Sequence, residues 1–164
     1  MAPDHGNAVG WTVNPATTGV IVSGNNVTAY GLAVEHYQKY EVIWSGQGGT
    51  DIFFQNEMPY DAPSQSAWMA NPATDGYPAF LITLRAAGFQ GYGMSSYSFF
   101  NQGVSVFATS AFETANPPDS ELHDLLTIFL SAAGSGGISH VVNGTGRSST
   151  AANPDTPVDV VSYP

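Results

Sequence analysis

The stretch Tyr30-Gly-Leu-Ala-Val-Glu-His-Tyr37, followed by Glu41-Val-Ile-Trp44, has a counterpart later in the chain. It matches Tyr92-Gly-Met-Ser-Ser-Tyr-Ser-Phe99, followed by Gly103-Val-Ser-Val106, and the offset is the same in both halves of the match. Such a repeat is typical of a solenoid, whose coils stack and bury a continuous core between neighbours. At ~20–25 residues per coil, the offset corresponds to two or three coils. The repeat favours a β-solenoid over a β-sandwich, which remains the structural alternative.

Short apolar segments, bounded by Gly, Asn, Asp or Pro, recur along the whole chain and predict an all-β fold. They are Gly19–Val22, Asn26–Tyr30, Glu41–Trp44, Asp51–Phe54, Ala79–Thr83, Gly103–Phe107, Leu125–Leu130 and Gly137–Val142. Ser120–Leu126 is the one helical candidate, with a serine cap, but it equally well leads into a strand.

The domain organisation follows from where this pattern is interrupted. Coils are expected over residues 1–145, with a long Pro-, Asn- and Ser-rich loop leaving the stack at about residues 58–76. Residues 146–164 are rich in Ser, Thr and Pro, and we expect them to form an extended or frayed C-terminal tail.

The charge balance narrows the choice of partners. Three Lys and Arg stand against 13 Asp and Glu, for a formal net charge of -10, so nucleic acid and anionic membrane surfaces are not expected partners. The chain has no Cys, which excludes disulfides and thiolate chemistry. Met1–His5 opens with neither a basic nor an apolar signal region. We nevertheless expect a secreted protein, because the composition is typical of extracellular β proteins, with its signal outside this sequence.

Few groups in the sequence can carry out chemistry. There is no Gly-x-Ser-x-Gly elbow, and the four histidines, His5, His36, His123 and His140, lack metal-ligand spacing. The glycine-rich turns do not lead into a helix that would bind phosphate. From the histidine spacing and these turns together, we expect neither a metal nor a cofactor.

Two glutamates stand out because they lie in apolar, aromatic segments. The spacing between Glu35 and Glu57 is close to the length of one coil, which would place them about one rung apart in a solenoid. Two carboxylates brought together are the minimum set for glycoside hydrolysis. The alternative is that both belong to a solvated face. Tyr60 and Trp68 lie in the presumed loop beside Glu57 and are candidate platforms on which a sugar could stack.

At these positions the sequence resembles glycoside hydrolase family 55 and its secreted bacterial relatives. The resemblance rests on Val27–His36 and on Gln55-Asn-Glu-Met-Pro-Tyr60, and is strongest over about residues 20–65. It implies a right-handed parallel β-helix that forms the C-terminal part of an inverting, mainly exo-acting β-1,3-glucanase. Glu57 would then be the general acid, Glu35 would help to hold the nucleophilic water, and Gln55 and His36 would be supporting substrate-binding residues.

The family builds much of its cleft from an N-terminal β-helical half. We therefore expect this chain to pair with such a half or to self-associate, with a β-glucan as the ligand. The alternative function is a noncatalytic carbohydrate-binding or structural β-helix module.

Overall fold

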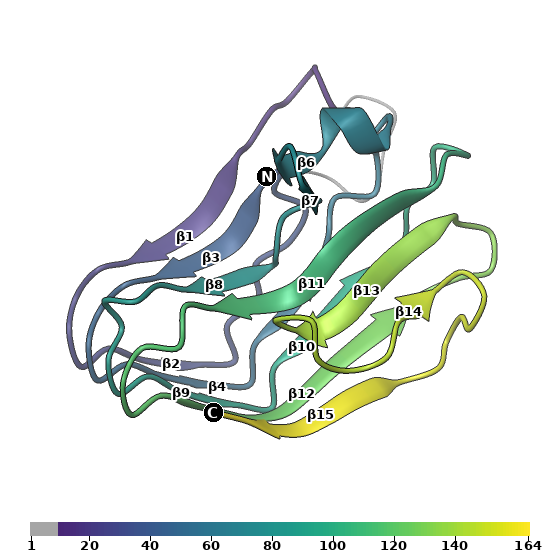
Figure 1. Cartoon of the computed structure of the whole chain (residues 1–164). Coiled ribbons are helices and arrows are strands. Elements are labelled where there is room, and N and C mark those ends of the chain that lie inside the picture. Colours follow the sequence, from purple (N-terminus) through teal and green to yellow (C-terminus); the bar gives the residue numbers. More distant parts are fainter. Residues whose placement is uncertain (1–9) are drawn as a thin grey trace.

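A computed structural model describes residues 10–164; His5 and the start of the predicted coil region lie outside the described residues. The described chain is almost entirely β, and its strands form two large sheets and one small one (Figure 1). One sheet contains β1 (Thr18–Val22), β3 (Tyr40–Trp44), β8 (Phe80–Ile82), β11 (Val106–Thr114), β13 (Gly136–Val142) and β14 (Ser149–Thr150). The other contains β2 (Thr28–Tyr30), β4 (Thr50–Ile52), β9 (Gln90–Tyr92), β12 (Glu121–Phe129), β10 (Ser95–Ser98) and β5 (Gln55–Glu57), with β15 (Val158–Tyr163) paired to β12.

Parallel pairing dominates both large sheets. In the first, the successive register partners are Val20, Val42, Phe80, Phe112 and Val142. The chain therefore returns to the same column of the sheet on each pass, although the passes differ in length. The β-sandwich alternative is wrong, because the sheets of a sandwich are built from antiparallel neighbours.

The internal repeat is half confirmed. Tyr30 is in register with Tyr92 through the intervening strand β4, so the offset of the repeat holds in this part of the match. The second half would align Val42 with Val104, but the register connects Val42 through β8 to Phe112, which lies further along the chain. The two halves differ because stacking fixes the strand register but leaves the length of each connecting segment free.

A sharp bend of the backbone recurs at the end of each of the stacked strands β2, β4 and β9 and within β12. Gly31, Phe53, Gly93 and Asp124 follow register partners in four successive passes, and their φ angles are 64, 68, 63 and 54°. Left-handed φ suits glycine and is costly for a bulky residue such as phenylalanine. The bend separates β4 from β5 and β9 from β10, and it creates a second face on each pass.

Aromatic side chains fill the interior between the sheets. Trp44 and Phe80 stack with ring centroids 6.1 Å apart, and Phe54 meets Phe80 edge-on at 5.1 Å. All three are fully buried. Each such ring contributes about 3–5 kcal/mol when judged by truncation to alanine, so this interior holds the stacked strands together.

The segment between β5 and β8 leaves the stack, as predicted for residues 58–76, and returns to it. It contains the 3-10 helix η1 (Gln65–Ala67) and a small sheet of β6 (Met69–Asn71) and β7 (Thr74–Asp75). Trp68 anchors it, because this side chain is 1% exposed and its Nε1 donates to the carbonyl of Gln38 at 2.8 Å.

Residues 146–164, predicted to form an extended or frayed C-terminal tail, contain two extended strands and are not frayed. β14 pairs antiparallel with β13, and β15 pairs antiparallel with β12 along most of its length. Val158 of β15 is buried. Residues 146–164 are therefore docked against the body, because they cover strands that would otherwise present a free edge. Ser120–Leu126, which the sequence left open between a helix and the start of a strand, lies in a strand, because Glu121–Phe129 forms β12.

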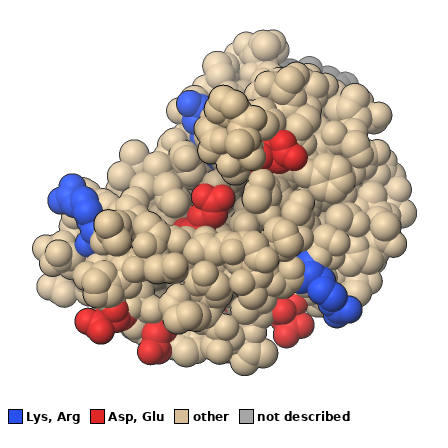
Figure 2. All heavy atoms as spheres, in the orientation of Figure 1, with Lys and Arg blue, Asp and Glu red and all other residues tan. Residues whose placement is uncertain are grey.

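Charged side chains are sparse on the outer side of the β1-β3-β8-β11-β13 sheet. Figure 2 shows them as single blue or red groups scattered over a largely uncharged surface. This face carries no cluster of one sign of charge that would attract a polyion.

Candidate active site

The parallel register brings Glu35 and Glu57 to adjacent rungs. Ala33 forms a parallel bridge with Gln55, and the His36 N–H donates to the Glu57 carbonyl at 2.8 Å. Glu35 therefore stands opposite Glu57, and the backbones of their two strands are one inter-strand spacing of ~4.8 Å apart. This is the one-rung placement that their spacing in the sequence predicted.

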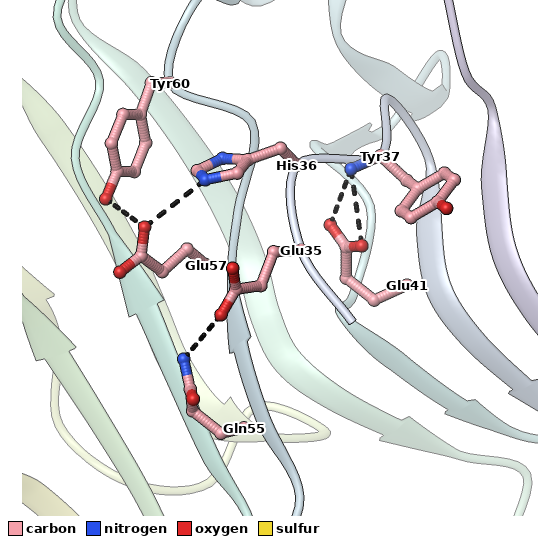
Figure 3. Close-up of polar contacts among 7 residues, drawn as sticks. All are labelled: Glu35, His36, Tyr37, Glu41, Gln55, Glu57 and Tyr60. Carbon is pink, nitrogen blue, oxygen red and sulfur yellow. Dashed lines mark hydrogen bonds and ion pairs between the residues drawn. The ribbon is translucent and has the colours of Figure 1, made fainter. Parts of the chain in front are cut away.

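Glu35 is held by a residue from the neighbouring rung. The Gln55 side-chain amide donates from Nε2 to Glu35 Oε1 at 2.8 Å. Gln55 and Glu57 are alternate residues of β5, so their side chains project to the same side of the strand. The amide thus orients one glutamate beside the other (Figure 3).

Two groups converge on a single oxygen of Glu57. The Tyr60 O–H donates to Oε2, and His36 Nε2 lies 3.3 Å from the same oxygen, although it is not aligned for a hydrogen bond. The Glu57 side chain is 25% exposed and that of His36 only 6%. The Tyr60 ring also stands edge-on to the imidazole, with centroids 4.6 Å apart. Glu57 thus keeps access to solvent while its partners are packed behind it.

His36 adopts an unusual backbone conformation. Its φ of 61° is left-handed, which is uncommon outside glycine and costs roughly 1–2 kcal/mol. The bond from its N–H to Glu57 holds the turn in place. Strain of this kind persists where the surrounding structure fixes it, often at functional sites. Here it points the imidazole at the Glu57 carboxylate.

A third carboxyl group, which the sequence reading did not select, lies behind this turn. Glu41 is 1% exposed, and the Tyr37 N–H donates to both of its carboxyl oxygens, at 3.0 and 3.3 Å. Burial raises the pKa of Glu41 to about 9; the Tyr37 N–H opposes this rise and the charge of Glu35 adds to it. Glu41 is therefore protonated at neutral pH.

The sequence shows the rung position of Glu41 but not its burial. Gly19-Val-Ile-Val22 recurs as Glu41-Val-Ile-Trp44, and the structure pairs these strands in register. A carboxyl group occupies the column that a glycine occupies one pass earlier.

The aromatic predictions divide. Tyr60 bonds to Glu57, and its role as a sugar platform stays a prediction. Trp68 as a sugar platform is wrong: its ring is buried against Phe100, at a centroid distance of 5.3 Å, and its indole N–H is already bonded. A loop position suggested exposure, but the loop folds back and uses the indole as its anchor.

Among residues 10–164, no three His, Asp or Glu side chains gather as ligands for a metal ion. Over the same range, no helix has the length and apolar character needed to cross a membrane.

Comparison with known proteins gives consistent matches. Residues 1–57 match the family model of the LAM55 pectate lyase-like domain. An exo-β-1,3-glucanase of Streptomyces sp. (strain SirexAA-E / ActE) is 42% identical over 161 residues, which is 98% of this chain and 26% of that protein.

Solved structures agree. The structure of sacteLam55A from Streptomyces sp. SirexAA-E has a TM-score of 0.91 and 41% identity, covering 99% of this chain and 29% of that one. A glutamate-to-alanine variant of the same protein in complex with glucose has a TM-score of 0.87 and 40% identity, with the same coverage. These matches confirm the resemblance to glycoside hydrolase family 55. The chain spans about a quarter of the length of the curated relative it matches.

Proposed function

We propose that this chain forms one wall of a glycoside hydrolase site that cleaves β-1,3-glucan with inversion, on a right-handed parallel β-helix. The observation that carries the proposal is the placement of Glu35 and Glu57 on adjacent rungs, each held by a different partner. Support for the substrate class comes from the similarity to an exo-β-1,3-glucanase and to a structure solved with glucose.

Glu57 is the proposed general acid. Both of its contacts fall on Oε2, which leaves Oε1 to carry the proton to the departing glycosidic oxygen. Once that proton has left, the hydrogen bond donated by the Tyr60 O–H stabilises the carboxylate that remains, and the His36 imidazole lies 3.3 Å from the same oxygen. Charge-assisted hydrogen bonds of this kind are stronger than neutral ones. They therefore favour proton transfer in the direction of bond cleavage.

Glu35 is the proposed residue that positions the attacking water. Gln55 occupies its Oε1, so Oε2 is the oxygen that accepts a hydrogen from water. An inverting enzyme requires a water on the face of the sugar opposite the general acid, with one carboxylate for each role. Gln55, His36 and Tyr60 surround the two glutamates, and contact with the substrate stays a prediction for all three.

The remaining wall of the cleft is proposed to come from further polypeptide. The chain spans 26% of the curated relative, so most of that protein lies outside the part matched here. A preceding β-helical half or a second copy of this chain would supply it. Because the proposed substrate, β-1,3-glucan, is a polysaccharide that lies outside cells, we also propose that the protein is secreted.

A graft tests the function directly. This chain replaces the matching quarter of the Streptomyces exo-β-1,3-glucanase, and the release of reducing sugar from laminarin is measured. The proposal predicts turnover by the graft and its loss on Glu57→Gln, by ~10² or more, as expected for removal of general acid catalysis. Proton NMR of the first glucose released should show the α anomer, because inversion at a β linkage produces it.

Glu121→Gln is the matched control. Glu121 Oε2 also lies next to a histidine, 3.2 Å from His123 Nε2, but its side chain is 60% exposed and it belongs to β12. This variant should keep full turnover. If Glu57→Gln also keeps it, the general acid assignment is wrong. Binding of laminari-oligosaccharides by the graft without hydrolysis would instead support a noncatalytic carbohydrate-binding module.

A further inference from the structure

The buried carboxyl of Glu41 bonds to the turn that carries two residues of the site. Its partner is the N–H of Tyr37, the residue that directly follows Glu35 and His36. Both oxygens accept this one N–H, so the carboxyl is aimed at a single point of the turn (Figure 3). A contact at Tyr37 constrains the backbone from which the two preceding side chains project.

The fold makes room for this carboxyl. Glu41 lies between Gly19 on the preceding pass and Ala79 on the next, neighbours that have no side chain or only a methyl group. A Cβ added at Gly19 would lie 2.6 Å from the Glu41 carbonyl and 2.3 Å from Val34. A side chain at position 19 would therefore clash with Val34 and with the backbone of Glu41.

The surroundings of Glu41 determine its protonation state. Burial raises its pKa to about 9, and the nearby charge of Glu35 contributes to this rise. The rung neighbours on β1 and β8, Gly19 and Ala79, offer no titratable group. Glu41 is thus neutral at pH 7 and places no second negative charge behind Glu35.

We propose that Glu41 is a positioning residue for this site, which fixes the Glu35–Tyr37 turn so that Glu35 faces Gln55 and His36 faces Glu57. The proposal deepens the function proposed above and rests on it. Glu41 does not touch the substrate; it acts through the backbone of Tyr37. Its role requires a hydrogen-bond acceptor in a buried position and does not require a negative charge.

Three variants separate these requirements. Glu41→Gln keeps an acceptor oxygen and removes the charge at every pH. Glu41→Leu keeps the volume and removes the acceptor, and Glu41→Asp withdraws the carboxyl by one methylene if the leucine variant fails to fold. Asp51→Asn is the control, since it changes a buried acid in a different column.

NMR of this chain gives readouts that need no activity. The amide proton of Tyr37 should exchange at the wild-type rate in Glu41→Gln and about 2- to 13-fold faster in Glu41→Leu, the factor that corresponds to the net free energy of one ordinary hydrogen bond. The Gln55 side-chain NH2 reports on Glu35, to which it is bonded. Its resonances should move in Glu41→Leu and stay in place in Glu41→Gln and in the control.

A pH titration adds a signature that a purely structural role would not produce. In the wild type, the Gln55 NH2 resonances should show a step near pH 9, where Glu41 ionises. That step should be absent in Glu41→Gln. In the graft, Glu41→Leu should lower kcat by about 100-fold, the scale of an approximately 1 Å misplacement, and Glu41→Gln should restore most of it.

The outcomes distinguish the two proposals. Unchanged Gln55 resonances in Glu41→Leu, or in Glu41→Asp if that variant is used, would overturn the positioning role. So would a Glu41→Gln variant that matches the leucine variant in every readout. A graft without any glucan turnover would count against the proposed function, while the NMR readouts would still decide the role of Glu41.

Discussion

Asp51 offers a direct test of the physical reasoning about the interior. Its side chain is fully buried in β4, between the rung neighbours Ala29 and Gly91, and neither carboxyl oxygen has a hydrogen-bond partner. Burial raises its pKa to about 7 from an ordinary value near 3.8. The folded protein therefore binds a proton at Asp51 more tightly than the unfolded chain does.

The sign of the pH dependence follows from this difference. Between pH ~4 and ~7 the unfolded chain has released the proton while the folded protein still holds it, so the free energy of unfolding falls as pH rises. Above pH ~7 both states are ionised at Asp51 and the loss is complete. A shift of about three pKa units corresponds to at most about 4 kcal/mol, and relaxation of the site reduces this to about 2–4 kcal/mol.

Asp51→Asn removes the titration and keeps the shape of the side chain. The variant and the wild type should have similar free energies of unfolding near pH 4, and at pH 8 the variant should be more stable by about 2–4 kcal/mol. Urea unfolding followed by the fluorescence of the buried Trp44 and Trp68 measures both. Glu41 contributes its own slope, which is common to both proteins and cancels in the comparison.

Asp159→Asn, at an exposed position of β15, provides the control and should change the free energy of unfolding by less than about 0.5 kcal/mol at every pH. A difference between wild type and Asp51→Asn that does not vary with pH would refute the reasoning. So would a variant that is less stable than the wild type at pH 8.

Three further predictions concern single side chains. Tyr60→Phe removes the hydrogen bond that the Tyr60 O–H donates to Glu57 and should lower kcat of the graft about 10- to 100-fold. An unchanged melting temperature of this variant would show that only the site is affected. Trp68→Ala should destabilise the chain by about 3–5 kcal/mol in urea unfolding, because the indole is buried; a loss of glucan affinity at unchanged stability would contradict this. Phe53→Gly should raise the free energy of unfolding by about 1 kcal/mol in thermal unfolding, because Phe53 has a φ of 68° and its side chain is 64% exposed. A lower free energy of unfolding in this variant would mean that the Phe53 ring is packed.

The sequence predicted the one-rung placement of Glu35 and Glu57 better than it predicted the rest of the stack. Glu35 and Glu57 were placed on neighbouring rungs because both lie on the shortest pass, where their spacing equals the interval between the register partners Val20 and Val42. Later passes are longer, because loops of different length separate their strands. The expected coil length therefore fails for the register between Val42 and Phe112, although the strands themselves were recognised.

The positions that the sequence could not predict are those where burial depends on the bend of the backbone. Glu41 and Val42 are consecutive and both buried, so simple alternation along β3 would have exposed the glutamate. Trp68 was misassigned for the same kind of reason: a segment rich in polar residues folds back on the body. Residues 146–164 show no strand pattern alone, and they form strands because β12 and β13 provide edges to pair with.

The stacked register also explains why the two glutamates occur at one end of the fold. The column that contains Glu35 and Glu57 continues with Tyr97 and Ile128, so the carboxylates occupy only its first two rungs. Within residues 10–164, the rung of Glu35 is the outermost of this column, because Ala33 bridges to Gln55 on one side alone. In the proposed function, further polypeptide that completes the cleft would extend the stack from this edge. The proposed role of Glu41 fits this position. The Glu35–Tyr37 turn lies at the edge and has no strand on its outer side, so the hydrogen bond from Tyr37 to Glu41 would hold it in place.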